Sequence, residues 1–296
     1  MKMPAAVRSG LRRFAMSCSP MPTPIENTCD CHAHVFADPS QFPLDPSADY
    51  TPPVATAEHY RQQLDQLGIK RCVLVQPSVY GTDNSALLAA LGQLGPGARG
   101  VAVIALDTPT SDLQVMHRQG VRGIRLNTLA NNGPTLEQLP AFERCINGLP
   151  WHLQVLLRPQ QMLGAIEQLE KVSAPLVLDH FASYTPETSD QEIDALFALA
   201  QRKDNLWIKL SAPYLFSDCS PQALDGYRRF SERAIELMPE RLLWGTDWPH
   251  TARRDVPIDA EQLYSTITGW IRDNAVLRKI TVDNPAALYQ LEEDAA

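Results

Sequence analysis

The chain has 296 residues, of which 44% are hydrophobic and 20% are charged, a composition that can bury the core of one large domain or two smaller ones. Its 34 acidic and 26 basic residues give a net charge of -8, which excludes the basic surface that nucleic acid requires and a polybasic membrane anchor. No apolar run approaches the roughly 18 residues that a membrane span needs, so we predict neither nucleic acid nor membrane as a partner.

Six cysteines are scattered along the chain, and no two of them form a Cys-x-x-Cys pair. This distribution predicts free thiols in a reducing compartment, and we expect the protein in the cytoplasm. The first 26 residues carry four basic side chains and several prolines, with no acid before Glu26. They predict a disordered tail at 1–26 before a single folded domain at 27–296, and the sequence leaves a homo-oligomer open.

From Asn27 onward, short apolar runs alternate with longer segments of helical period, as in a parallel sheet with crossover helices. We predict eight strands, at Thr28–Phe36, Arg71–Gln76, Gly100–Leu106, Gly123–Asn127, His152–Leu157, Leu176–His180, Leu206–Leu210 and Leu242–Thr246. Helices are predicted at Ala57–Leu67, Ser85–Leu94, Ser111–Gln119, Leu136–Gly148, Gln160–Lys171, Gln191–Arg202, Gln222–Met238 and Ala260–Trp270. This count matches one (β/α)8 TIM barrel of the α/β class, regular or distorted, with its active site at the C-terminal ends of the strands.

Two histidines in the first predicted strand, His32 and His34, are separated by a single residue. Side chains alternate between the faces of a strand, so both rings and Asp30 are expected on one face, with Cys29 and Cys31 on the other. Histidines on one face form a pair of metal ligands or of electrophiles, and packing in the core is the alternative. The proline-rich segment Pro39–Pro53 that follows this strand is expected to lie over the catalytic face.

Other predicted strands also carry polar side chains near their C-terminal ends. They are Arg125 and Asn127 on the fourth strand, Asp179 and His180 on the sixth, Lys209 and Ser211 on the seventh, and Asp247 after the eighth. Unpaired buried charges cost several kcal/mol, so packing alone does not explain so many of them, and we predict one shared active site. His152 lies at the opposite end of its strand and is interpreted as structural, whereas a place for His250 at the rim of the site is left open.

Several blocks of the sequence follow one another in a characteristic order. They are Asp30–Phe36, Tyr50–Pro52, Val73–Gln76, Thr82–Asn84, Gly120–Asn127, Asp179–His180, Leu243–His250 and Asp283–Tyr289. In this order and spacing they resemble the amidohydrolase superfamily, in its amidohydrolase-related branch that includes the 2-pyrone-4,6-dicarboxylate lactonases. The resemblance covers about residues 28 to 290.

The resemblance implies an enzyme that opens the lactone ring of a small carboxylated substrate. Asp247 would activate water as the general base, and His32, His34 and His180 would polarise the ester carbonyl. General acid–base catalysis contributes ~100 to 10,000-fold, and loss of one oxyanion donor costs about 3 kcal/mol. Arg125 would bind a substrate carboxylate through two charge-assisted hydrogen bonds. The remaining predicted binding residues are Asn127, Tyr50, Ser211, Tyr184 and His250.

A metal is compatible with these residues, because neutral imidazoles and a carboxylate make a sound zinc set. If zinc or another divalent metal binds, the predicted ligands are His32, His34, His180 and Asp247. The branch that the chain resembles works without a metal, and the fifth predicted strand lacks the histidine that completes the usual set. We therefore favour no metal and no other cofactor.

The substrate is less well defined than the reaction. The pyrone dicarboxylate enzymes carry arginines shortly after the histidine of the sixth strand and the serine of the seventh, where this chain has Phe181–Tyr184 and Ala212–Leu215. A monocarboxylate, a sugar-acid lactone or a sulfonated muconolactone therefore stays open beside pyrone dicarboxylate. The space of the missing arginines is expected to be filled by the phenols of Tyr50, Tyr80, Tyr184 and Tyr214, or else by Arg253 and Arg254 as anion binders. Two other activities are alternatives, namely a zinc decarboxylase of the aminocarboxymuconate type and a lactone isomerase.

Overall fold

Eight parallel strands form the centre of the protein in the computed structural model, which describes residues 23–130, 133–252 and 258–292. The strands are β1 (Cys29–Ala33), β2 (Arg71–Val75), β3 (Ala98–Ala102), β4 (Val121–Asn127), β5 (His152–Leu156), β6 (Leu176–Leu178), β7 (Leu206–Leu210) and β8 (Leu242–Trp244), and each pairs with the next. Ala33 also pairs in parallel with Trp248, so the sheet curves into a nearly closed barrel. The predicted (β/α)8 fold is confirmed, whereas most of the predicted tail lies outside the described residues.

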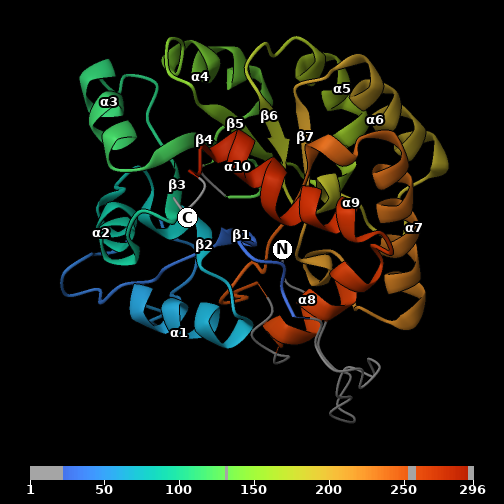
Figure 1. Ribbon diagram of the computed structural model, residues 1–296. Helices are drawn as coiled ribbons and strands as arrows, with labels where there is room; N and C mark the ends of the chain where they lie inside the picture. Colours follow the sequence, from blue (N-terminus) through green and yellow to red (C-terminus); the bar gives the residue numbers. More distant parts are fainter. Residues whose placement is uncertain (1–22, 131–132, 253–257, 293–296) are drawn as a thin grey trace, which may run out of the picture.

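Helices surround the strands on the outside (Figure 1). They are α1 (Ala57–Leu67), α2 (Ser85–Leu94), α3 (Thr110–Arg118), α4 (Leu139–Cys145), α5 (Met162–Glu170), α6 (Asp190–Arg202), α7 (Pro221–Leu237) and α8 (Ala260–Gly269). After α8 the chain forms α9 (Asn274–Arg278), the π-helical turn η7 (Lys279–Asp283) and α10 (Asn284–Tyr289). None of the described helices has the length and apolar character that a membrane crossing needs.

Local sequence chemistry explains where these elements begin and end. Thr56 caps α1 with its side chain, and Gly68 ends that helix with a φ of 71°, a left-handed conformation that glycine adopts without strain. All five residues of β2 are buried, because parallel strands are covered by helices on one side and by the barrel interior on the other. The five described cysteines form no disulfide with one another, as the sequence predicted.

One prediction about β1 is wrong. The pairing of β1 with β2 shifts register between Asp30 and Ala33, so alternation along the strand is interrupted there. As a result Asp30 contacts Tyr60 of the surrounding helix α1, whereas His32 contacts Asp179 of the barrel interior. Asp30 and His32 therefore do not share a face.

Candidate active site

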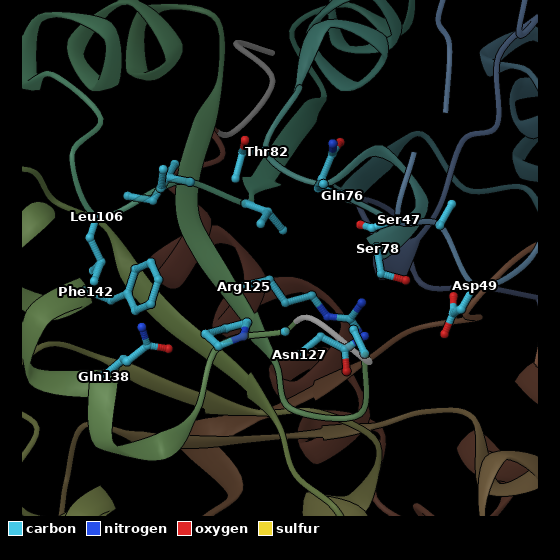
Figure 2. Close-up of a pocket in the computed structure, with 18 residues that line it drawn as sticks. Ser47, Asp49, Gln76, Ser78, Thr82, Leu106, Arg125, Asn127, Gln138 and Phe142 are labelled. Atoms are coloured by element: carbon cyan, nitrogen blue, oxygen red, sulfur yellow. The ribbon is translucent and has the colours of Figure 1, made fainter. Parts of the chain in front are cut away.

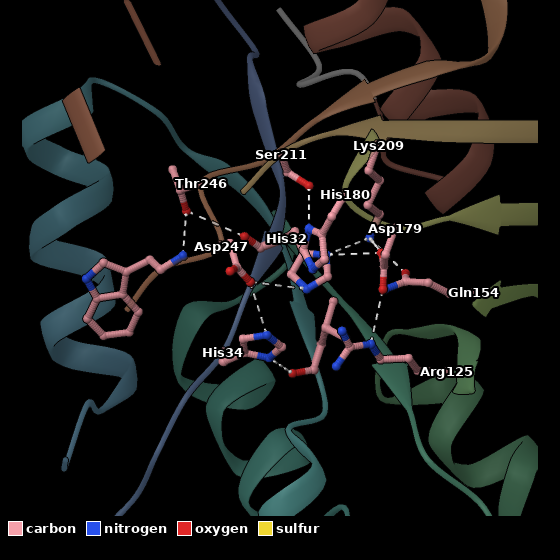
Figure 3. Close-up of polar contacts among 12 residues, drawn as sticks. His32, His34, Arg125, Gln154, Asp179, His180, Lys209, Ser211, Thr246 and Asp247 are labelled. Atoms are coloured by element: carbon pink, nitrogen blue, oxygen red, sulfur yellow. Dashed lines mark hydrogen bonds and ion pairs between the residues drawn. The ribbon is translucent and has the colours of Figure 1, made fainter. Parts of the chain in front are cut away.

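The three predicted histidines and Asp247 meet at the C-terminal end of the barrel (Figure 3). His34 Nε2 lies 3.3 Å from Asp247 Oδ1, and His32 Nε2 lies 3.6 Å from the same oxygen. The His180 ring is tilted against that of His32, with 4.6 Å between centroids. Side chains separated by more than two hundred positions in the sequence thus form one cluster.

The backbone turns sharply where two of these residues follow their strands. His180 and Asp247 have φ values of 50° and 60°, in the left-handed region that non-glycine residues rarely adopt. For this reason β6 and β8 end at Leu178 and Trp244, earlier than predicted. The Asp247 amide donates to the His32 carbonyl at 2.7 Å, which holds the turn after β8 against β1.

Asp247 is an ionised carboxylate held from both sides. Its Oδ1 faces the two histidines of β1, and its Oδ2 accepts a hydrogen bond of 2.6 Å from Tyr214 Oη. Burial alone would raise the pKa of Asp247, but His180, His34 and His32 outweigh that effect and hold it well below its ordinary value. A carboxylate in this state accepts a proton from a neighbouring acid or water.

Hydrogen bonds orient the two histidines that face the cavity. His34 Nδ1 lies 2.7 Å from the Val75 carbonyl, which only accepts, so Nδ1 carries a proton and Nε2 faces Asp247. His180 Nδ1 lies 2.9 Å from Ser211 Oγ. Burial lowers the pKa of His180 although Asp247 and Asp179 oppose the shift, so the neutral ring is favoured. When Ser211 donates to Nδ1, the proton of His180 lies on Nε2.

Beneath these rings lies a fully buried network centred on Asp179. Its Oδ2 accepts hydrogen bonds of 3.1 Å each from Arg125 Nε and Gln154 Nε2. Its Oδ1 lies 3.3 Å from His32 Nδ1 and 3.8 Å from Lys209 Nζ. Burial opposes ionisation, but His32, Arg125 and Lys209 hold the pKa of Asp179 well below its ordinary value. One carboxylate therefore contacts both the predicted carboxylate binder and a site histidine.

A cavity of about 610 Å³, here called the catalytic cavity, opens above the cluster. Its lining includes His34, His180 and Asp247, together with Tyr50, Arg125 and Asn127 from the predicted set. His32 is completely buried and does not line it. The structure therefore places His32 beneath Asp247, where it acts on a substrate in the cavity only through its neighbours.

Three other predicted site residues do not line the catalytic cavity. Ser211 contacts His180 from behind. Tyr184 packs in the helical layer against the rings of Tyr227 and Phe230, at centroid distances of 5.0 and 5.3 Å. His250 stacks edge-on against Tyr214 at 5.7 Å, and burial lowers its pKa to about 4. Arg253 and Arg254 lie outside the described residues.

Several residues make contacts at the site that differ from the sequence predictions or were not predicted. Tyr214 donates to Asp247, and Gln154 accepts a hydrogen bond of 2.8 Å from Lys209 Nζ. A glutamine and a lysine in otherwise apolar strands β5 and β7 were the signal that could have indicated this network. Asp30 accepts bonds from the His32 and Thr246 amides, of 3.1 and 2.8 Å, and so joins β1 to the segment after β8.

The residues present fit a divalent cation. One ligand atom each from His32, His34 and Asp247 lies within 4.8 Å of the others, and so does a second group formed by His32, Asp179 and His180. His32 Nε2 is buried and makes no hydrogen bond in the described part of the chain, while His34 Nε2 and a carboxylate oxygen converge on the same point. Either a shared proton or a metal ion would satisfy this arrangement. The structure thus divides the four predicted ligands between two overlapping groups.

A parallel barrel with an ionised carboxylate and histidines at the C-terminal ends of its strands defines the class of TIM-barrel enzymes. The sequence profile of one such family, the amidohydrolases, matches residues 29–291, and the chain belongs to this family.

Two relatives and one solved structure extend the comparison. A 2-pyrone-4,6-dicarboxylate hydrolase of Comamonas testosteroni is 34% identical over 89% of this chain and 90% of its own length. A D-galactarolactone isomerase of Agrobacterium fabrum is 29% identical over 96% of this chain and 98% of its own length. A structure from Acinetobacter baumannii, described as a probable 2-pyrone-4,6-dicarboxylic acid hydrolase with citric acid bound, has a TM-score of 0.79 and 29% identity, covering 89% of this chain and 99% of that chain.

Proposed function

We propose that the protein hydrolyses the lactone ring of a small carboxylated substrate. The observation that carries this proposal is the ionised Asp247, which lines the catalytic cavity beside His34 and His180. The name of the 2-pyrone-4,6-dicarboxylate hydrolase supports the same reaction, and the name of the D-galactarolactone isomerase supports a lactone as substrate. The five described cysteines form no disulfide with one another, which favours a reducing compartment, and we propose the cytoplasm as the site of action.

In the proposed reaction, Asp247 removes a proton from a water molecule in the catalytic cavity. The water oxygen forms a bond to the lactone carbonyl carbon, and the carbonyl electron pair moves onto its oxygen. When that oxyanion collapses, the bond between the carbonyl carbon and the ring oxygen breaks. Asp247 returns its proton to the ring oxygen, which leaves as an alcohol, and the product carboxylic acid ionises. Tyr214 keeps the carboxylate in position by its bond to Oδ2.

His180 and His34 are proposed to act on the carbonyl. A proton on His180 Nε2 would donate to the developing oxyanion, and Ser211 supports that tautomer from Nδ1. His34 keeps one proton on Nδ1 for the Val75 carbonyl, so its Nε2 at the edge of the cavity donates to the carbonyl only when the ring is an imidazolium. Donors fixed in advance cost no reorganisation during the reaction, and each is worth about 3 kcal/mol.

Arg125 is proposed to bind the substrate carboxylate. Its bond to Asp179 uses Nε, so the two terminal nitrogens are the pair directed to a ligand. Asn127 and Tyr50 line the same cavity and would hydrogen-bond the ring substituents. His32, Ser211 and Tyr184 are proposed to support the site from behind its lining.

We propose that turnover needs no metal. The C-terminal end of β5 carries Leu156, so this strand adds no imidazole to the two groups of possible metal ligands. The absence of a histidine at this position also disfavours the zinc decarboxylase alternative. If a divalent ion binds, His32, His34 and Asp247 would hold it, and it would supply Lewis-acid polarisation of the carbonyl. Enzyme treated with a chelator and shown metal-free by elemental analysis is expected to keep its kcat, and recovery of lost activity by added zinc would contradict this proposal.

A lactone isomerase is the second candidate, because the isomerase relative matches nearly the whole chain. In that reaction a hydroxyl of the substrate, instead of water, attacks the carbonyl. A panel of pyrone dicarboxylate, muconolactones and aldarolactones in ¹⁸O-labelled water separates the two. Hydrolysis releases a proton and places ¹⁸O in the product, whereas isomerisation does neither.

The same panel tests Asp247. Replacement by asparagine keeps the shape of the side chain but removes the base, so we expect kcat to fall by about 100-fold or more with the fold retained. Circular dichroism and thermal unfolding provide the control for folding. Turnover at the wild-type rate in Asp247→Asn would remove Asp247 from this role.

A further inference from the structure

A second cavity adjoins the catalytic cavity and has no role in the reaction described above. Its volume is about 510 Å³, and we call it the side cavity. It lies between the segment after β1, the ends of β2 and β3, and the loop after β4 (Figure 2). The two cavities share five lining residues, which are Asp49, Ser78, Arg125, Asn127 and Ala130. A ligand whose carboxylate is bound by Arg125 can therefore extend from the catalytic cavity into the side cavity.

The lining of the side cavity is mostly uncharged. Val103, Ile104, Leu106 and Phe142 form an apolar part, and Ser47, Thr82 and Gln138 are among the neutral polar residues. Within the described residues, Arg125 is the only lysine or arginine that lines either cavity. The other charged residue of the side cavity is Asp49, whose carboxylate would repel an anion.

Leu106 supports this reading of the side cavity. Its side chain is 42% exposed, one of four large hydrophobic residues with such exposure among those described. Phe142, which lines the same cavity, is 7% exposed. An apolar group of a ligand placed here would contact the buried Phe142 and would remove Leu106 from water, which favours binding.

The segments that follow β6 and β7 carry Phe181 and Tyr214, whose side chains are engaged in other contacts. Phe181 is completely buried among the rings of Tyr227, Phe230 and Trp270. Tyr214, on the loop after β7, donates to Asp247 and does not line either cavity. The described residues thus offer one cationic subsite, and beside it a space suited to an uncharged group.

We propose that the side cavity is a substrate subsite that takes an uncharged, largely apolar substituent. The preferred substrate would then be a lactone with one carboxylate, bound by Arg125, and an uncharged substituent of several carbon atoms. This inference rests on the proposed function and goes beyond it, because it selects among carboxylated lactones.

The test compares three γ-lactones that carry one ring carboxylate. The first has no further substituent, the second has an isobutyl group on the neighbouring ring carbon, and the third has a carboxymethyl group there, which matches isobutyl in shape but is charged. We expect kcat/KM for the isobutyl lactone to exceed that of the unsubstituted one by about tenfold. The carboxymethyl lactone is expected to fall about 100-fold below the isobutyl one. Equal values, or a preference for carboxymethyl, would overturn the proposal.

Ala105 allows the subsite to be filled, because it lines the side cavity and not the catalytic cavity. In Ala105→Trp the ratio of kcat/KM between the isobutyl and unsubstituted lactones should fall to about one. Ala275→Trp is the matched control, since Ala275 is exposed in α9 and lines neither cavity, and it should keep the wild-type ratio. A ratio that survives in Ala105→Trp would contradict the assignment of this cavity.

Binding separates this inference from the proposed function. Cyclopentanone analogues with the same substituents cannot be hydrolysed, and calorimetry gives their Kd. If the isobutyl analogue binds about tenfold tighter than the unsubstituted analogue while no lactone is hydrolysed, the subsite proposal is supported and the lactonase proposal is contradicted. If the lactones are hydrolysed but the analogues all bind with the same Kd, only the subsite proposal is contradicted and the lactonase proposal is retained.

Discussion

Histidines lie at both ends of this barrel, in opposite surroundings. At the C-terminal end His32 and His34 face a carboxylate oxygen of Asp247 at 3.6 and 3.3 Å. At the N-terminal end of β5, the ring of His152 packs edge-on against Tyr289, with 5.3 Å between centroids. It also lies so close to Gly123 that a Cβ on that residue would come within 2.4 Å of the ring. Neither nitrogen of His152 has a hydrogen-bond partner in the described part of the chain.

This difference shows what makes an imidazole useful in a barrel. Burial lowers the pKa of His152 to about 3, so its ring is neutral and packs as an aromatic side chain. Burial acts in the same direction on His180, but there two carboxylates oppose it and the ring lines a cavity. The histidines at the C-terminal end of the barrel differ from His152 in two respects: they lie next to a carboxylate, and His34 and His180 line a cavity that a ligand can enter.

The largest expected effect comes from replacing one histidine at each end of the barrel and comparing the losses of activity. Replacement of His180 by glutamine removes a proposed oxyanion donor, so kcat should fall by about 100-fold or more. His152→Leu has a similar volume and removes unpaired polar atoms, so kcat/KM should change less than about threefold and the thermal midpoint should hold or rise. Steady-state kinetics and calorimetry on the two variants provide the measurement, and equal losses of activity would contradict the assignment of the two ends.

Asp179 should show an intermediate effect, because it acts through its neighbours. Asp179→Asn leaves Arg125 and His32 without their shared carboxylate. We expect KM for a carboxylated lactone to rise and kcat to fall, each by about tenfold, since a charge-assisted bond contributes 1.5–3 kcal/mol. A neutral lactone without the carboxylate should show the loss of kcat but not the rise in KM. Identical behaviour of both substrates would indicate a purely structural residue.

The smallest expected effect concerns stability and pH. Unfolded His152 titrates near 6.5 and the folded residue at about 3. As the pH falls from 6.5 toward 3, the unfolded chain gains a proton that the folded chain does not, so the free energy of unfolding decreases. In His152→Leu this contribution is absent, and the decrease should be shallower. Denaturant unfolding of both proteins between pH 7 and pH 4 gives the two slopes, and parallel slopes would contradict the prediction.

The repeating pattern of the sequence was enough to predict the barrel and the cluster of His32, His34, His180 and Asp247. Parallel strands deliver their C-terminal residues to the same end, so order along the chain translates into position. The face of β1 on which Asp30 lies was not predictable, because a register shift within the strand reverses the alternation of side chains between the two faces. Asp179, Arg125, Lys209 and His32 were predicted at one site, but their contacts with one another and with Gln154 were not, since Asp179 contacts side chains of four other strands whose registers no single segment reveals.

The junction of β1 with the segment after β8 has a consequence for the synthesis of the protein. One edge of β1 pairs with β2, but its other edge contacts the segment after β8: Asp30 accepts bonds from Thr246, and the Asp247 amide donates to the His32 carbonyl. These contacts form only when a segment more than two hundred residues further along the chain is present. During translation, an emerging chain that stops before Asp247 holds its imidazoles without their acid. The nascent polypeptide therefore cannot hydrolyse a lactone until Asp247 has left the ribosome.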